Sequence, residues 1–240
     1  MLFLEFVFWL CVFLIFYCFV GYPVSLFLLR KLIKRKNTAD TSMRPSVSII
    51  IPAHNEEQVI RSKLINLTSL NYPNDLLEII IASDNSTDRT NEIVEQFISE
   101  KPEYNIKLYK VNKRQGKTNA QNEAVKIAEG EILVFSDANA ILHEDAIIHL
   151  VSSFTSEDII YVTGRLKYIN NLEHVSSDAE SSYWEFDLLM REIESDIATV
   201  TAGNGALYAI PKKDYVEFSP ISSHDSAMPL YAGLNHKRAI

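Results

Sequence analysis

Residues 47–56 read VSIIIPAHNE, and this stretch decides the fold. The β-branched run from Val47 to Ile51 is typical of a parallel strand that is buried on both faces. Pro52 ends the run, because proline donates no ladder hydrogen bond. Asn55 is a good helix N-cap, and Gln58 follows three residues later, as in a capping box. The stretch therefore predicts a buried strand that leads into a helix.

The same alternation continues along the chain. Further strands are predicted over residues 77–82, 107–111, 132–135 and 159–163. Helices are predicted to start at Asn55, to start at Ser86 or Thr87, and to span residues 117–128 and 144–154. Alternating strands and helices imply an α/β fold with a mostly parallel sheet and helices on both faces. Ligands of such sheets bind outside the carboxyl ends of the strands.

Polar side chains follow three of the predicted strands. These clusters are Ala53-His54-Asn55, residues 83–88 and Asp137-Ala138-Asn139. Asp84, at a strand end, could accept hydrogen bonds from a ribose hydroxyl or from a base N–H. The neighbouring Asn, Ser and Thr residues are also typical of helix caps and Asx-turns, and Asp84 taken alone fits that interpretation better.

Asp137 and Asn139 are separated by one residue, so their side-chain oxygens can face the same cation. Mg²⁺ and Mn²⁺ prefer oxygen ligands and are commonly shared with substrate phosphates. A carboxylate and an amide make a weaker site than two carboxylates, and the pattern is common by chance. Lys113, Arg114 and Lys117 could contact a pyrophosphate, although an ordinary solvated loop explains these cations equally well.

Composition and missing motifs exclude several classes of protein. The net charge is −8, and basic residues crowd into residues 30–36 instead of spreading over a folded surface, so nucleic acid is not an expected partner. The chain has no Ser-His-Asp order, no metal-binding His/Cys spacing and no P-loop. These absences argue against a hydrolase, a zinc enzyme and a P-loop nucleotidase. The two cysteines, Cys11 and Cys18, lie in the first apolar run.

The N-terminal segment predicts a transmembrane helix. From Leu2 to Leu29 the only formal charge is Glu5, and about 20 apolar residues span a bilayer as a helix. Pro23 is expected to kink it. A cleaved signal peptide is the alternative, but no basic residue precedes the apolar run and the basic cluster follows it. Positive residues tend to stay in the cytosol, so we expect the chain after Arg30 to be cytosolic.

The predicted organisation is a membrane helix with a basic flank, a polar linker and a globular domain, over residues 1–36, 37–45 and 46–240.

The polar clusters together resemble one family. The segments that carry the resemblance are Ser48–Glu56, Ser83–Asp88, Gly116-Lys117 with Asn122, and Phe135–Ala140. In order, spacing and strand context they resemble the family 2 inverting glycosyltransferases of the GT-A fold. The resemblance is greatest to the membrane-bound branch that includes cellulose, hyaluronan and poly-N-acetylglucosamine synthases. It covers roughly residues 47–240 and implies a GT-A domain behind one N-terminal transmembrane helix.

The resemblance also implies roles for particular residues. The family's nucleotide-sugar contacts fall on Ala53, His54, Glu56, Asp84, Lys117 and Asp137. Its D-x-D metal motif falls on Asp137 and Asn139, with Asn in place of the second acid, and implies Mg²⁺ or Mn²⁺. Its acceptor-side loop falls on Gly203, Asn204 and Gly205.

Asp225 takes the position of the family's catalytic base. His224 stands where an acid is usual, and Ser226 stands where Phe is common. Residues 183–186 resemble the start of a helix beside the membrane or the acceptor channel, although an amphipathic core helix explains them equally well.

The implied function is transfer of a sugar from a UDP-sugar to a polysaccharide or lipid-linked acceptor, in contact with membrane lipid. The family's Q-x-x-R-W segment and further membrane helices do not occur before Ile240. We therefore also keep the hypothesis of a nucleotide-sugar-binding fragment, or a subunit that a separate membrane chain complements. A nucleotidyltransferase on a related scaffold would carry a glycine-rich signature after the first strand, where Pro52-Ala53-His54-Asn55 stands instead.

Overall fold

A computed structural model describes residues 2–33, 35, 38–167 and 176–240, with side chains except those of residues 176–183. The described chain packs as two compact units. The first contains α1 (Leu2–Phe16), η1 (Tyr17–Gly21), α2 (Tyr22–Leu32) and α7 (Ser176–Ile197). The second contains the sheet and the other helices.

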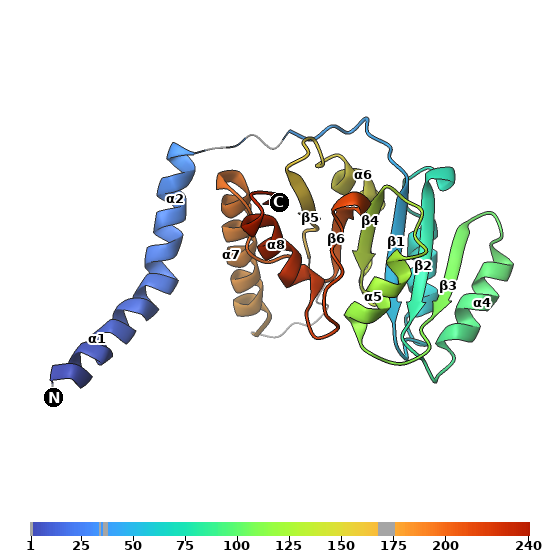
Figure 1. Ribbon diagram of the computed structural model, residues 1–240, viewed down its shortest axis with the longest axis horizontal. Helices are drawn as coiled ribbons and strands as arrows, with labels where there is room; N and C mark the ends of the chain where they lie inside the picture. Colours follow the sequence, from blue (N-terminus) through green and yellow to red (C-terminus); the bar gives the residue numbers. More distant parts are fainter. Residues whose placement is uncertain (1, 34, 36–37, 168–175) are drawn as a thin grey trace. The chain divides into compact units, whose positions relative to one another are not determined.

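Within the described residues the second unit is built on a seven-stranded sheet (Figure 1). The strands are β1 (Val47–Ala53), β2 (Leu77–Ser83), β3 (Asn105–Lys110), β4 (Ile132–Ser136), β5 (Ile159–Thr163), β6 (Leu207–Pro211) and β7 (Arg238–Ala239). Their spatial order is β3-β2-β1-β4-β6-β5-β7. β6 runs antiparallel to both of its neighbours, and the other pairs are parallel. The predicted mostly parallel α/β sheet is confirmed.

Helices cover both faces of this sheet because alternate strand residues point to opposite sides. The helices are α3 (Ile60–Thr68), α4 (Thr90–Glu100), α5 (Lys117–Val125), α6 (Ala146–Val151) and α8 (His224–Leu234), with short 3-10 turns η2 (Asn74–Leu76) and η3 (Lys212–Asp214). Ile49, Ile51 and Ile79 share one core with apolar residues of α3, α4 and α6. On the other face the ring of Phe135 stacks on that of Tyr208, with the ring centroids 4.9 Å apart, and contacts the ring of His224 of α8 edge-on.

Two predicted helix starts were wrong by three to five residues. Asn55 does not cap a helix, since α3 begins at Ile60. The backbone of Asn55 is left-handed (φ 57°), and its side-chain oxygen accepts a hydrogen bond from the N–H of Thr87 at 2.8 Å. The next helix, α4, begins at Thr90, whose N–H donates to Asp88 at 3.0 Å. The side chain of Asn55 thus bonds the turn before α4 and not the start of α3, and Asp88 takes the place of Ser86 or Thr87 at the start of α4. Local sequence does not reveal such competition between neighbouring turns.

The first unit carries the apolar N-terminal segment. Its helical run Leu2–Leu32 is long and apolar enough to cross a membrane, with a mean hydropathy of 2.5 over its most apolar window. A π-helical turn, η1, interrupts the run just before Pro23, where a kink was predicted. Leu26 of α2 packs on Met190 and Ile193 of α7. The cytosolic placement of the chain after this helix stays a prediction.

Residues 183–186 were expected to open a helix. They lie inside α7 instead, because that helix already begins at Ser176. In the same unit, Arg30 in the last turn of α2 forms an ion pair with Asp196 of α7 at 2.6 Å.

Candidate functional site

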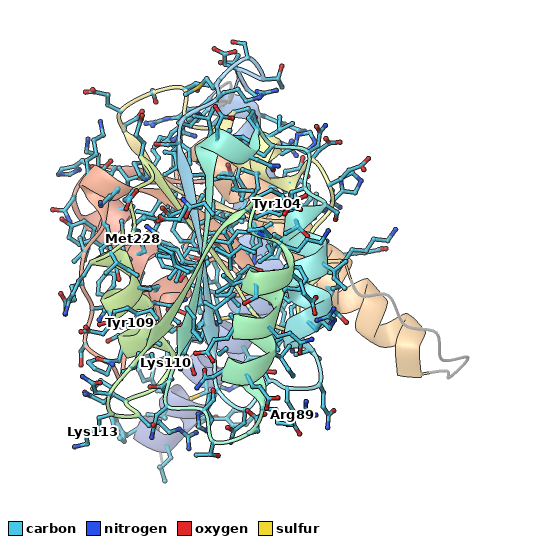
Figure 2. All side chains as sticks on the ribbon, turned by 90° about the vertical axis from the view of Figure 1, so that its right-hand side faces the viewer. Arg89, Tyr104, Tyr109, Lys110, Lys113 and Met228 are labelled. Atoms are coloured by element: carbon cyan, nitrogen blue, oxygen red, sulfur yellow. The ribbon has the colours of Figure 1, made fainter. Side chains whose placement is uncertain are left out.

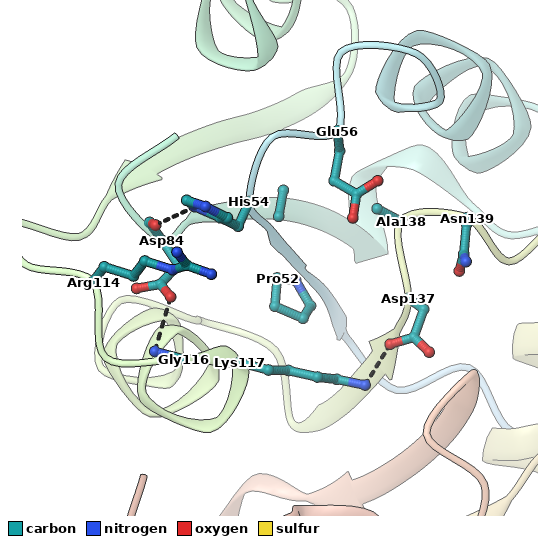
Figure 3. Close-up of a pocket in the computed structure, with 11 residues that line it drawn as sticks. Pro52, His54, Glu56, Asp84, Arg114, Gly116, Lys117, Asp137, Ala138 and Asn139 are labelled. Carbon is teal, nitrogen blue, oxygen red and sulfur yellow. Dashed lines mark hydrogen bonds and ion pairs between the residues drawn. The ribbon is translucent and has the colours of Figure 1, made fainter. Parts of the chain in front are cut away.

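The polar ends of β1, β2 and β4 meet at one pocket with a volume of about 370 Å³ (Figure 3). Its lining residues are Pro52, Ala53, His54, Glu56, Asp84, Arg114, Gly116, Lys117, Asp137, Ala138 and Asn139. The strand order reverses between β1 and β4, and such a switch point leaves a crevice at the carboxyl ends of the strands. The structure thus brings together the six predicted nucleotide-sugar residues and the predicted metal pair.

Asp84 anchors the loop that leads into α5. Its side chain is buried, at 3% exposure, and its backbone N–H donates to the carbonyl of Ala53 at 2.8 Å. The two carboxylate oxygens accept hydrogen bonds from the backbone N–H groups of Gln115 at 3.1 Å and Gly116 at 2.9 Å. Gly116 is left-handed (φ 94°), a conformation that favours glycine. The Asp84 carboxylate therefore positions the neighbouring cations as well as lining the pocket.

Those cations differ in their placement. Arg114 and Lys117 line the pocket, whereas Lys113 does not and its exposed side chain extends outward at the edge of the view in Figure 2. His54 lies beside Asp84, and its Nδ1 donates to the Asp84 carbonyl at 2.8 Å. In the neutral ring this arrangement leaves Nε2 as a hydrogen-bond acceptor.

Lys117, the first residue of α5, forms an ion pair with Asp137 across the pocket (Figure 3). Both side chains are partly exposed, 43% for Lys117 and 33% for Asp137. An ion pair with this exposure contributes at most about 1 kcal/mol, so a stronger ligand can displace it. The pair also shows that the Asp137 carboxylate lies where positive charge is accommodated.

The donor set at this end of the pocket fits a hard divalent cation that is shared with a ligand. Asp137 and Asn139 supply a carboxylate and an amide oxygen to the same pocket. Among the described residues no group of three or more His, Cys, Asp or Glu side chains could hold a metal unaided. Mg²⁺ and Mn²⁺ take six oxygen ligands, so most of them would have to come from water and from phosphate.

Asp225 lies in the first turn of α8, next to the pocket but not among its lining residues. One carboxylate oxygen accepts a hydrogen bond from the Ser223 hydroxyl. A Cβ placed on Gly205 would lie 2.8 Å from the other oxygen and 3.2 Å from Nζ of Lys117. Glycine at 205 therefore leaves room for the Asp225 carboxylate and the Lys117 ammonium to approach the same spot.

The loop that was predicted to lie on the acceptor side runs past Asp225. The N–H of Gly203 donates to the Asp225 carbonyl at 2.7 Å, which fixes the loop to the start of α8. Asn204 closes its own turn, since its side-chain oxygen accepts from the N–H of Ala206 at 2.9 Å. This loop is thus held beside the carboxylate by backbone contacts.

His224 faces the other way from its neighbour, into the core. It is 1% exposed, and its Nε2 lies 3.1 Å from Oδ1 of Asn122 and 3.2 Å from the hydroxyl of Tyr215. Burial lowers the pKa of His224 to about 4, against the opposing influence of Asp225. A neutral, buried ring does not supply the acid that the family usually has at this position. It ties α8 to α5 through Asn122 instead.

Sequence reasoning missed Lys63. This lysine of α3 is completely buried and donates to the hydroxyl of Ser136 at 2.7 Å and to the carbonyl of Ala140 at 2.6 Å. A signal was present, because Lys63 lies within the core-facing spacing of Ile60, Leu64 and Leu67, where a charged residue is unexpected.

Comparisons with known proteins agree on one family. The model of the family described as glycosyl transferase family 2 matches residues 48–208. A probable glycosyltransferase, YdaM, of Bacillus subtilis is 39% identical over 130 residues, which cover 52% of this chain and 30% of that protein. The beta-monoglucosyldiacylglycerol synthase of a Nostoc species is 30% identical over 163 residues, which cover 67% of this chain and 35% of that protein. The chain thus spans about a third of the length of these curated relatives.

Among solved structures, a mannosyltransferase of Pyrobaculum calidifontis in complex with GDP-Man and Mn²⁺ matches 95% of this chain and 64% of its own, with a TM-score of 0.80. The sequences are 24% identical, so this likeness shows a shared fold.

Proposed function

This chain belongs to glycosyl transferase family 2, and from that premise we propose that it transfers a sugar, with inversion, from a nucleotide diphosphate sugar to an acceptor hydroxyl. The observation that carries the proposal is the pocket at the ends of β1, β2 and β4. It combines a buried acid, two cations and a carboxylate–amide pair on a sheet edge that typically binds ligands.

Within this pocket we propose that the nucleoside lies near Ala53, His54, Glu56 and Asp84. The diphosphate would extend toward Lys117 and Asp137, since Lys117 is the cation in contact with the carboxylate end of the pocket. The proposed donor is a UDP-sugar. GDP-sugars enter the test as well, because the structure of the similarly folded mannosyltransferase is a complex with GDP-Man.

Asp137 and Asn139 would hold Mg²⁺ or Mn²⁺ together with the donor phosphates. When bound, the cation would stabilise the negative charge of the departing nucleoside diphosphate. Lys117 adds a positive charge at the same place, and its present ion pair with Asp137 would give way to the phosphates.

Asp225 is proposed as the general base. Ser223 holds one of its oxygens, and the other, beside Gly205, would take the proton of the acceptor hydroxyl as that oxygen attacks the anomeric carbon. The new glycosidic bond forms while the bond from the anomeric carbon to the diphosphate breaks, so one displacement inverts the carbon. The loop from Gly203 to Gly205 would contact the acceptor.

The acceptor is proposed to be a glycan or a lipid-linked hydroxyl. The N-terminal apolar helix could hold the enzyme at a membrane, where lipid acceptors are concentrated. A similar protein is named as a beta-monoglucosyldiacylglycerol synthase, which supports a lipid acceptor. Cytosolic orientation and a complementing membrane subunit belong to the same proposal.

The test is a transfer assay on membranes that contain the full chain. Radiolabelled UDP-sugars and GDP-sugars are supplied with Mn²⁺, and the anomeric configuration of the product is determined by NMR. An inverted product that depends on Asp225 is expected. Nucleotide binding without turnover would favour a non-catalytic nucleotide-sugar-binding subunit, and a product with retained configuration would contradict the mechanism.

A further inference from the structure

The completely buried Lys63 has no part in the proposed reaction, yet its ammonium group donates hydrogen bonds to Ser136 and Ala140, beside the proposed metal residues. Lys63 stands on the buried face of α3, together with the apolar residues Ile60, Leu64 and Leu67. Burying a charged group is costly unless hydrogen bonds compensate for the lost water. A leucine or methionine would fit such a position without this cost, so the charge must be explained by what it contacts.

Both acceptors of Lys63 flank the segment Asp137–Asn139. Ser136, the last residue of β4, stands directly before the segment, and Ala140 stands directly after it. The N–H of Ala140 donates in turn to the carbonyl of Asp137 at 3.2 Å, which closes the segment as a tight turn. One ammonium therefore clamps the two ends of the segment that supplies the proposed metal ligands.

The same contacts reach the loop beside Asp225. The Ser136 hydroxyl, which accepts from Lys63, donates to the carbonyl of Ala206 at 2.8 Å. Ala206 directly follows Gly205, which borders the Asp225 carboxylate. A chain of hydrogen bonds thus runs from the buried ammonium through Ser136 to the loop on the acceptor side.

We propose that Lys63 is a positioning residue, which sets the geometry of the Asp137–Asn139 segment and its register with the loop ending at Ala206. This inference rests on the proposed function of Asp137 and Asn139. Lys63 acts indirectly, through its hydrogen bonds to Ser136 and Ala140, since it is completely buried and does not line the pocket. Such supporting hydrogen bonds typically change metal affinity by about 10- to 100-fold when they are removed.

Three variants of the full chain in detergent test the proposal: K63M, S136A and, as control, K107M. Lys107 pairs with the buried Glu78 at the opposite end of the sheet, so K107M also removes a lysine charge next to a buried polar network. Mn²⁺ affinity is measured in the presence of UDP or GDP from the EPR signal of free Mn²⁺. Thermal unfolding is recorded for each protein.

K63M is expected to weaken Mn²⁺ binding about tenfold, and S136A about threefold, while the unfolding temperature of each stays close to that of the parent. K107M should lower the unfolding temperature and leave Mn²⁺ affinity unchanged. Should K63M fail to fold, S136A decides, because alanine is readily accommodated at a strand end. Mn²⁺ affinity within twofold of the parent in a folded K63M, or in S136A when K63M does not fold, would overturn the role of Lys63. A parent protein that binds no Mn²⁺ with either nucleotide would instead contradict the proposed function itself.

Discussion

The two ends of the sheet each bury a charged side chain, and they use it differently. At the amino end, Glu78 accepts hydrogen bonds from the Ser48 hydroxyl, from Lys107 at 2.5 Å and from the N–H of Glu129 at 2.9 Å. At the carboxyl end, Lys63 donates to two neutral oxygens, of Ser136 and Ala140, which flank the pocket-lining segment Asp137–Asn139. The first network pairs a buried carboxylate with a cation, whereas the second pairs a buried cation with neutral oxygens.

The pKa values of the two groups reflect this difference. Burial alone would raise the pKa of Glu78, but the hydrogen bonds from Lys107, Ser48 and Glu129 together lower it below its ordinary value. Burial lowers the pKa of Lys63 to about 7, and the nearby Asp137 only partly opposes this shift. At the amino end, the paired carboxylate of Glu78 stabilises the fold. At the carboxyl end, burial of the Lys63 ammonium costs stability, so a contribution to stability does not explain its presence there.

The largest expected effect is on catalysis at the carboxyl end. D225N should reduce sugar transfer by at least about 100-fold, because an amide cannot take the acceptor proton, and should leave nucleotide binding nearly intact. The measurement is the initial rate of radiolabel transfer together with nucleotide affinity. D145N is a suitable control, since Asp145 lies outside the pocket and accepts a hydrogen bond from Asn71. Equal transfer rates in D225N and the parent would reject Asp225 as the base.

At the amino end a glycine substitution should act on stability alone. A Cβ on Gly130 would lie 2.4 Å from the backbone nitrogen of Ser48, and backbone atoms in a buried strand cannot move aside. G130A should therefore lower the free energy of unfolding by about 3 kcal/mol, as overpacking does. Denaturant unfolding measures this loss, and nucleotide affinity of the remaining folded protein should not change. A stability equal to that of the parent would show that this end is less tightly packed than described.

The matched substitution at the carboxyl end should have the reverse effect. In G205A the new methyl group meets the free ends of the Asp225 and Lys117 side chains, which can move without unfolding the protein. Transfer should fall about tenfold while the unfolding temperature changes little, since the cost is a displaced base and not a broken core. Steady-state kinetics and thermal unfolding of the same preparation separate the two effects. Lost stability with unchanged transfer would place Gly205 with Gly130 as a packing residue.

The last prediction concerns His224, which lies between the core and the site. Because burial lowers the pKa of His224 to about 4 from 6.5, the unfolded chain binds a proton in this pH range that the folded chain does not. Stability should therefore fall as the pH falls from 6.5 toward 4, by at most about 1.4 kcal/mol per pH unit from this group. Unfolding free energies measured across this range should show a shallower slope in H224N. Identical slopes would mean that His224 is not held neutral.

The contrast between the two ends also explains what the sequence could predict. The β-branched runs at residues 47–51, 77–82 and 132–135 identified central strands, because a strand buried on both faces requires them. The convergence of Asp84 and Asp137 followed from topology, since carboxyl ends of parallel strands share one edge. The fold class could therefore be predicted without coordinates. The family resemblance, and not topology, identified the lining residues Ala53, His54, Glu56, Asp84, Lys117, Asp137 and Asn139.

Other features depend on which surfaces pack together, and local sequence does not encode that. The burial of Lys63 requires knowing that α3 lies against the end of β4. The Asp84 carboxylate holds a loop some 30 residues away, and His224 points into a core formed by α5 and β4. The helix starts at Ile60 and Thr90 were missed because neighbouring turns compete for the capping groups.

The central claim is that Asp137 and Asn139 hold a divalent cation together with a nucleotide diphosphate. The most direct measurement is calorimetric titration of UDP and GDP into the full chain, with and without Mn²⁺, for the parent and for D137A. A shared metal site predicts that Mn²⁺ tightens binding of one nucleotide in the parent by at least about tenfold, and that D137A abolishes this gain. Nucleotide binding that is indifferent to Mn²⁺, or a gain that persists in D137A, would contradict it.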